Sequence, residues 1–228
     1  MKERPILFND QMVRAILEGR KTVTRRIAKP VKHPDLGNIY APGALVLEHE
    51  PQHVVDRACP YGQPGDRLWV REAWQGPLIS DEEQAANQSW WKDMTKFQDQ
   101  AHCAYRASGD NNEYVDPDGY FHCKWKPSIH MPRWASRILL EIVSVRVERL
   151  QDGEGETAFE SRYLAEGMNR IHHGDGAHYY SAFRDETHPS NWCDPFDAWR
   201  ELWESINGAD SWAANPWVWV VEFKRVTP

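Results

Sequence analysis

The stretch Gly19-Arg20-Lys21-Thr22-Val23-Thr24-Arg25-Arg26 decides the fold of this chain, and it gathers four cationic and two hydroxyl side chains in eight residues. Before it, apolar residues recur at helical spacing, which predicts a short amphipathic helix over 12–17. Gly19 stands where a glycine ends such a helix. After it, the β-branched run 22–24 favours an extended chain, so we predict a strand to about Ala28. On spacing alone, a solvated basic turn before an edge strand explains the stretch.

The motif Gly-Arg-Lys-Thr-x-Thr-Arg, placed after a short helix, resembles the signature of the ASCH domain family. The segment 65–74 resembles the family's second strand, which ends in a glutamate. The segments 127–137 and 215–223 are similar to the versions that bacteriophages and prophages carry. These matches cover about half the chain and follow the family's order. The resemblance implies an α+β fold built on a PUA-like β-barrel, and an association with RNA.

Two polar stretches, at about 75–125 and 151–190, interrupt the matched segments. Their apolar content is thin, so we interpret them as insertions beside the barrel in a single domain over 1–228. Local composition and hydrophobic periodicity predict the other elements. We expect strands at 5–8, 44–48, 67–74, 101–106, 137–150 and 217–226, helices at 80–100, 158–166 and 194–206, and a loop at 128–136.

The composition predicts a globular protein, because 41% of the 228 residues are hydrophobic and 12% aromatic. No apolar run is long enough to span a membrane, and residues 1–5 lack the apolar centre of a signal peptide. We therefore expect a cytoplasmic protein that does not bind membranes; its oligomeric state is left open.

The four cysteines are widely spaced, which argues against disulfides in a cytoplasmic protein. The pairs 102–103 and 122–123 both read His-Cys and could supply half of a zinc site together with Cys59. Neither a Cys-x-x-Cys nor a His-x-x-x-His spacing supports that site, so reduced thiols are favoured. The histidines at 172, 173 and 178 suggest a metal only weakly. We predict no metal and no cofactor.

The formal net charge of −7 does not indicate nucleic-acid binding for the chain as a whole. The distribution of charge is more informative. Residues 1–30 hold eight Lys and Arg against three Asp and Glu, whereas residues 151–210 hold four against thirteen. A basic site on an acidic body favours a narrow phosphate-contacting cleft over a long duplex-binding face.

Lys21, Thr24 and Glu72 are the candidate catalytic residues. A threonine hydroxyl attacks well only when a neighbour takes its proton, and a lysine does so only when burial or nearby cations lower its pKa. A glutamate could hold the lysine or pass a proton to a leaving amine. The structural alternative is an exposed Lys21, a strand-forming Thr24 and a Glu72 paired with an arginine.

The resemblance favours the catalytic interpretation. Small bacterial ASCH proteins similar in these segments are amidohydrolases that release cytidine and acetate from N4-acetylcytidine. It implies Lys21 as base, Thr24 as nucleophile and Glu72 as orienting carboxylate. Other ASCH proteins resemble ribonucleases or non-catalytic RNA-binding modules, one of which a phage could use against its host. Both stay as alternatives.

The candidate substrate-binding residues surround this triad in the matched segments. A tryptophan beside an arginine suits a stacked base with a phosphate held nearby. A buried tryptophan beside a surface arginine explains 133–134 equally well, and a loop hydrogen bond explains the histidine better than a general base. The candidates for binding a nucleoside or RNA are Arg25, Arg26, Arg71, His130, Arg133 and Trp134.

Overall fold

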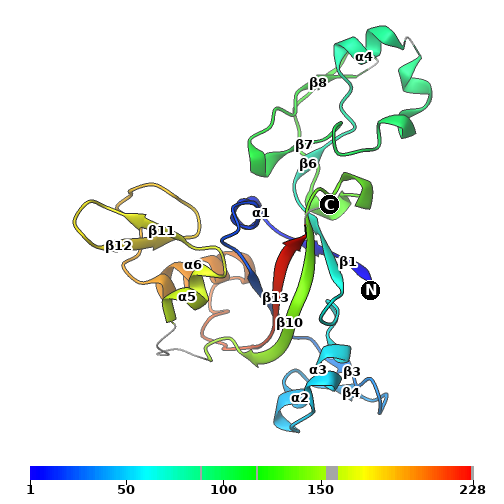
Figure 1. Cartoon of the computed structure of the whole chain (residues 1–228). Coiled ribbons are helices and arrows are strands. Elements are labelled where there is room, and N and C mark those ends of the chain that lie inside the picture. The colour runs from blue at the N-terminus through cyan, green and yellow to red at the C-terminus, as the bar shows by residue number, and fades with distance from the viewer. Residues whose placement is uncertain (88, 117, 153–158, 227–228) are drawn as a thin grey trace.

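A five-stranded sheet organises the structure, which is a computed structural model that describes residues 1–87, 89–116, 118–152 and 159–226. Its strands follow the order β1-β5-β10-β13-β2 (Figure 1). β1 pairs with β5 in parallel and every other neighbour is antiparallel. The strands are β1 (Glu3–Leu7), β2 (Val23–Ile27), β5 (Arg67–Arg71), β10 (Leu139–Arg149) and β13 (Trp217–Val226).

Both faces of the sheet are covered, because alternate residues of β13 enter two different cores. Trp219 and Val221 pack in the first core, whereas Val218 and Val220 pack in the second. A strand that is buried on both faces reads as a continuous apolar run, as this one does.

The first core lies under α1 (Asp10–Leu17), α2 (Ala44–Leu47) and α3 (Gln52–Ala58). The second lies under α5 (Phe159–Leu164) and α6 (Pro195–Asn207). Side chains cap the longest helices: Asn9 accepts from the backbone of Met12, and Asp194 accepts from that of Phe196. These caps set where α1 and α6 begin.

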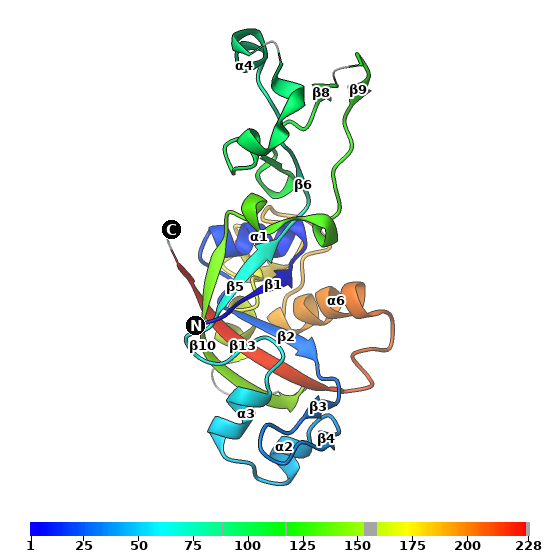
Figure 2. The same cartoon turned by 90° about the vertical axis from the view of Figure 1, so that its right-hand side faces the viewer.

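Residues 74–127 form a lobe that projects beyond one end of the sheet (Figure 2). The lobe meets the body in a small third core that contains Trp74, Tyr105 and Met131. Its elements are β6 (Trp74–Gln75), α4 (Asp81–Ala86), β7 (Ala104–Tyr105), β8 (Tyr114–Val115), β9 (Phe121–His122) and the 3-10 turns η1 (Trp90–Lys92), η2 (Met94–Phe97) and η3 (Arg106–Ser108).

The remaining elements are short. Hairpin β3 (Val31–Lys32) and β4 (Ile39–Tyr40) lies near α2 and α3, and hairpin β11 (Asn169–His172) and β12 (His178–Ser181) lies beside α5 and α6 (Figure 1). Two 3-10 turns, η4 (Ser128–His130) and η5 (Arg133–Ala135), lead from the lobe into β10.

The sheet is open in the part of the chain that the structure describes, since β1 and β2 are its two edges. A side chain joins these edges: Arg26 Nη2 donates to the Leu7 carbonyl at 2.6 Å. The mixed α and β composition agrees with the α+β expectation, whereas the closed PUA-like barrel stays a prediction.

Several predicted elements are confirmed. The strand before the first helix, the helix that ends before Gly19, the basic strand, α6, β10 and β13 all occur within one or two residues of their predicted bounds. Gly19 has a φ of 76°, the left-handed conformation expected of a glycine that ends a helix.

The strand predicted at 44–48 is wrong, because these residues form α2. Gly43, at a φ of 83°, turns the chain into the helix and lies so close to the Trp217 ring that a Cβ would overlap it. This long-range contact, together with burial of Leu45 in the first core, outweighs the local preference for a strand.

The helix predicted at 80–100 is also mostly wrong. A capping box between Ser80 and Glu83 starts α4, but the helix stops at Ala86. The Asn87 side chain then accepts from the backbone of Ser89, and such local hydrogen bonds compete with the helical ladder.

The other differences concern the bounds and lengths of short elements. β5 ends at Arg71 rather than at 74, β7 is two residues long, and the loop predicted at 128–136 contains η4 and η5. Within the described residues, the helix predicted at 158–166 corresponds to α5. The hairpin β11–β12, which follows it, was not predicted. Positions 153–158 of the second predicted insertion lie outside the described residues.

Candidate functional site

The basic signature is held against the segment that follows α5. Backbone N–H groups of Thr22 and Val23 donate to the Ala165 carbonyl at 2.9 and 3.1 Å. Arg20 Nη1 donates to the Gly167 carbonyl at 2.7 Å. These bonds bring Glu166, between the two, to the side chains of the signature.

Lys21 is completely buried and its ammonium group is bound by this segment. Its Nζ donates to a Glu166 carboxylate oxygen and to the Glu166 carbonyl, both at 2.8 Å. The side chains of both residues are almost fully excluded from solvent. The partner of Lys21 is therefore Glu166, a residue 145 positions away in sequence.

Arg25 shares the same carboxylate. Its Nη1 donates to the other Glu166 oxygen at 2.7 Å and its Nε donates to Glu148 at 3.0 Å. Its guanidinium group also lies 5.4 Å from the centre of the Trp199 ring. Glu148 is in turn held by Arg146 and Arg162, so the buried charges form one connected network.

Burial and charge set the ionisation of this network. Burial lowers the pKa of Lys21, and the neighbouring cations Arg26 and Arg25 lower it further, against the opposing pull of Glu166. Burial acts to raise the pKa of Glu166, but the charges of Lys21 and Arg25 outweigh it and keep that pKa below its usual range. Glu166 therefore stays ionised, while Lys21 gives up its proton more easily than a solvated lysine.

Thr24 and Glu166 line one small inner cavity of about 50 Å³ between β2 and α6. Trp199 and Trp203 of α6 form its apolar wall. The Thr24 side chain is almost fully buried. The cavity has room for a small group beside Thr24, but not for a nucleobase.

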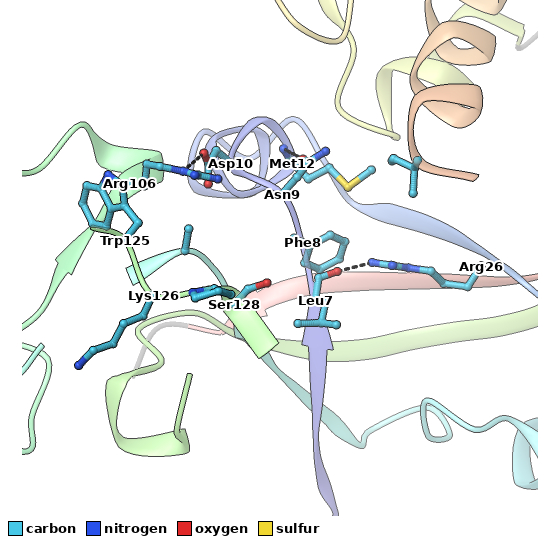
Figure 3. Close-up of a pocket in the computed structure, with 13 residues that line it drawn as sticks. Leu7, Phe8, Asn9, Asp10, Met12, Arg26, Arg106, Trp125, Lys126 and Ser128 are labelled. Atoms are coloured by element: carbon cyan, nitrogen blue, oxygen red, sulfur yellow. Dashed lines mark hydrogen bonds and ion pairs between the residues drawn. The ribbon is translucent and has the colours of Figure 1, made fainter. Parts of the chain in front are cut away.

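A larger, open outer pocket of about 470 Å³ adjoins this inner cavity, since Met12, Arg26 and Ile206 line both. Figure 3 shows Phe8 on the sheet side and Trp125 on the lobe side of the outer pocket. The Arg26 guanidinium group lies 5.1 Å from the Phe8 ring centre. A volume of this size is typical of small-molecule sites.

The lobe closes one side of the outer pocket through an ion pair at its rim. Arg106 Nε donates to an Asp10 carboxylate oxygen at 2.6 Å, a contact that Figure 3 marks. α1 and the lobe are thereby joined across the pocket.

Glu72, the third predicted catalytic residue, has a different partner and lines neither pocket of the signature. Its two carboxylate oxygens accept from Arg137 Nε and Nη2, each at 2.9 Å. The Arg137 guanidinium group stacks 3.9 Å from the Tyr105 ring centre, in the third core at the base of the lobe. Burial raises the pKa of Glu72 although Arg137 opposes that shift. Glu72 thus has the arginine partner of the structural alternative.

Three of the predicted binding residues lie on or beside β5 and in the third core. Arg71 and Arg133 lie 4.7 and 6.0 Å from the Trp69 ring centre, and Arg133 pairs with Glu3. Trp134 packs edge-on against Trp74 in the third core. None of them, nor the exposed His130, lines either pocket of the signature. Of the six predicted binding residues, Arg25 and Arg26 are the two that do.

A separate polar pocket of about 270 Å³ lies beside α1 and the start of the signature. Arg14, Arg20 and Arg184 line it together with Glu18 and Asp185. Glu18 neutralises Arg20, whereas the Arg184 side chain has no hydrogen-bond partner among the described residues. The Arg14 and Arg184 guanidinium groups, which no carboxylate pairs with among the described residues, suit a phosphate.

Metal ligands do not cluster in the described ranges: no three His, Cys, Asp or Glu side chains are placed to hold an ion there. The His-Cys pairs are split, with Cys103 half-buried and Cys123 exposed. Nor does any helix of those ranges have the length and apolar character needed to cross a membrane.

Sequence patterns offered no signal for Glu166. It stands in a short Ala-Glu-Gly segment with neither periodicity nor a neighbouring basic residue, and only the fold brings it to Lys21. No family profile, curated protein or solved structure matches the chain.

Proposed function

We propose that this protein hydrolyses the amide of an N-acylated nucleoside or RNA base, with N4-acetylcytidine as the specific substrate. The observation that carries the proposal is the buried Lys21–Glu166 pair, whose carboxylate lines the same inner cavity as Thr24. Lys21 is the base, Thr24 the nucleophile, and Glu166 takes the carboxylate role that the family resemblance gave to Glu72.

The charges of the network support such a reaction. Because burial and two arginines lower the pKa of Lys21, its neutral amine is accessible and can accept the Thr24 proton. The hydroxyl oxygen then attacks the amide carbon, and the C–N bond breaks as Lys21 returns the proton to the leaving amine. Water hydrolyses the resulting threonine ester, which releases acetate and restores the hydroxyl. Glu166 stays ionised and orients Lys21 throughout.

The sizes of the outer pocket and the inner cavity support this choice of substrate. The outer pocket has the size of a small-molecule site and carries Phe8 and Trp125 for contact with a flat ring. The inner cavity accepts only a small group, as an acetyl is. The nucleobase would therefore lie in the outer pocket with its acyl group directed at Thr24.

The test is incubation of the purified protein with N4-acetylcytidine and mass analysis for cytidine and acetate. We expect Thr24→Ala to abolish turnover with the fold intact, and Thr24→Ser to keep part of it. Lys21→Ala should lower turnover by about as much as Thr24→Ala, about 10³-fold or more. Removing either member of a catalytic unit costs about as much as removing the whole unit. A wild-type protein that hydrolyses neither this compound nor related N-acyl nucleosides would overturn the proposal.

Two glutamate variants separate the carboxylate roles. Glu166→Gln should lower turnover per folded molecule strongly, and Glu166→Asp, which keeps the charge but shortens the reach, should lower it less. Glu72→Gln is the matched control: it should lower thermal stability, since Glu72 pairs with Arg137, and leave turnover per folded molecule unchanged. The reverse pattern would return the catalytic role to Glu72.

A second candidate is a non-catalytic RNA-binding module. The observation that favours it is the three-arginine pocket beside the signature, which an amide hydrolase acting on a free nucleoside does not need. RNA binding without any hydrolysis would support this candidate.

A further inference from the structure

The lobe carries its own large pocket, remote from the signature. This lobe pocket has a volume of about 1160 Å³ and is formed between α4, η1 and the β8–β9 hairpin. Figures 1 and 2 both show these elements projecting from the body of the molecule. The volume lies above the usual range for small-molecule sites, and is better suited to a short segment of polypeptide.

Exposed aromatic rings line the lobe pocket. Trp90 and Trp91 stand edge-to-face with ring centres 6.1 Å apart, and Tyr114 and Phe121 face the same space. Trp91 is 50% exposed and Phe121 62% exposed. Rings of this size are seldom left in water without a partner, and clusters of them mark interaction sites.

The charge of the lobe pocket is predominantly negative. Five carboxylates line it, and the described lining contains neither lysine nor arginine. The carboxylates are Asp81, Glu82, Glu83, Glu113 and Asp116.

Two of these carboxylates are already engaged. Glu83 and Asp99 hold His102 at 2.9 and 2.8 Å, and Asp116 pairs with His122. The other three, Asp81, Glu82 and Glu113, have no side-chain partner in the part of the chain that the structure describes. They are free to bind a cation from outside.

We propose that the lobe pocket binds a lysine- or arginine-bearing segment of a partner protein. Carboxylates supply the counter-charge, and the aromatic faces attract an ammonium or guanidinium group by cation–π contact. The same field repels phosphate, so the lobe pocket is not a second nucleic-acid site. This inference does not depend on the proposed hydrolase activity.

The test is titration of the full chain with two short fluorescent peptides. In one peptide arginine alternates with serine, and in the other glutamine replaces every arginine. Anisotropy should show binding of the arginine peptide alone, weakening as salt is raised. Trp91→Ala should weaken it about tenfold, since an exposed aromatic anchor is lost. The double variant Glu82→Gln, Glu113→Gln should weaken it several-fold.

The control is Glu204→Gln, which removes one half-buried carboxylate on α6, away from the lobe, and should leave peptide affinity unchanged. N4-acetylcytidine hydrolysis, where present, should be the same in all these variants. Equal binding of the two peptides, or variants that bind as tightly as wild type, would overturn the proposal. So would a dimer in sedimentation that Trp91→Ala dissociates, because the occupant would then be a second copy.

Discussion

Lys21 lies between one carboxylate and two guanidinium groups with no solvent around its ammonium group. Separating such a buried pair leaves an uncompensated charge, at a cost of about 3–5 kcal/mol. Stability alone does not explain such an ion pair, because a well-packed apolar pair of similar volume often stabilises a fold equally well. A buried lysine with a lowered pKa is instead a common feature of catalytic sites.

The pH dependence of hydrolysis should follow Lys21. The reaction needs its neutral amine, and burial lowers the pKa of Lys21 below that of a solvated lysine, so kcat/KM should rise with pH with a midpoint below pH 10.5. Arg26→Gln removes a cation that favours the neutral amine, and should move the rising limb to higher pH. Rates measured across pH for wild type, Arg26→Gln and Arg71→Gln check this.

Arg71→Gln is the control, because Arg71 stacks on Trp69 and does not line the signature's pockets. A limb that stays in place in Arg26→Gln, or moves to lower pH, would show that Lys21 is not the titrating base.

Among the elements, the turn between α5 and β11 leaves no room for a side chain at its glycine. Gly167 has a φ of 98°, and a Cβ there would stand 2.9 Å from the Cβ of Ala15 and 3.3 Å from that of Lys21. The absence of a side chain lets the backbone of this turn approach α1 and the signature. The position of Glu166 at Lys21 depends on that approach.

Gly167→Ala should lower both stability and hydrolysis, because the new methyl group displaces the turn and Glu166 with it. Gly174→Ala is the matched control, with a φ of 89° and no atom within 4 Å of its Cβ. The control should lose only about 1 kcal/mol of unfolding free energy for its backbone conformation, with activity retained. Urea unfolding and the acetylcytidine assay measure both effects; equal losses in the two variants would contradict the close-contact argument.

At the scale of the whole molecule, charge is segregated over an acidic body of net charge −7. The signature's side of α1 carries the three-arginine pocket, whereas the projecting lobe carries the carboxylate-lined one. Arg71 and Arg133, expected near the catalytic residues, instead lie around Trp69. These two arginines therefore do not add to the positive charge around the signature.

RNA binding, if it uses this surface, should weaken steeply as salt rises from about 50 to 200 mM, because phosphate contacts release counterions. Arg184→Gln should weaken it at every salt concentration. Arg133→Gln should not, since Arg133 pairs with Glu3 elsewhere. Filter binding of a single-stranded oligonucleotide measures all three, and binding insensitive to salt would indicate a small neutral ligand instead.

The sequence by itself determined the elements whose side chains repeat with a clear period. The helix before Gly19, the basic strand, β10, α6 and β13 were predictable because local preference and burial agree there. The family resemblance, rather than spacing, made Lys21 and Thr24 candidates, and their catalytic role stays a prediction. Only the tertiary structure decided that Glu166 rather than Glu72 meets Lys21, and that 44–47 is helical against Trp217. Ion pairs and close packing of this kind join residues that are far apart in the sequence. A pattern of a few neighbouring residues therefore cannot predict which of them will meet.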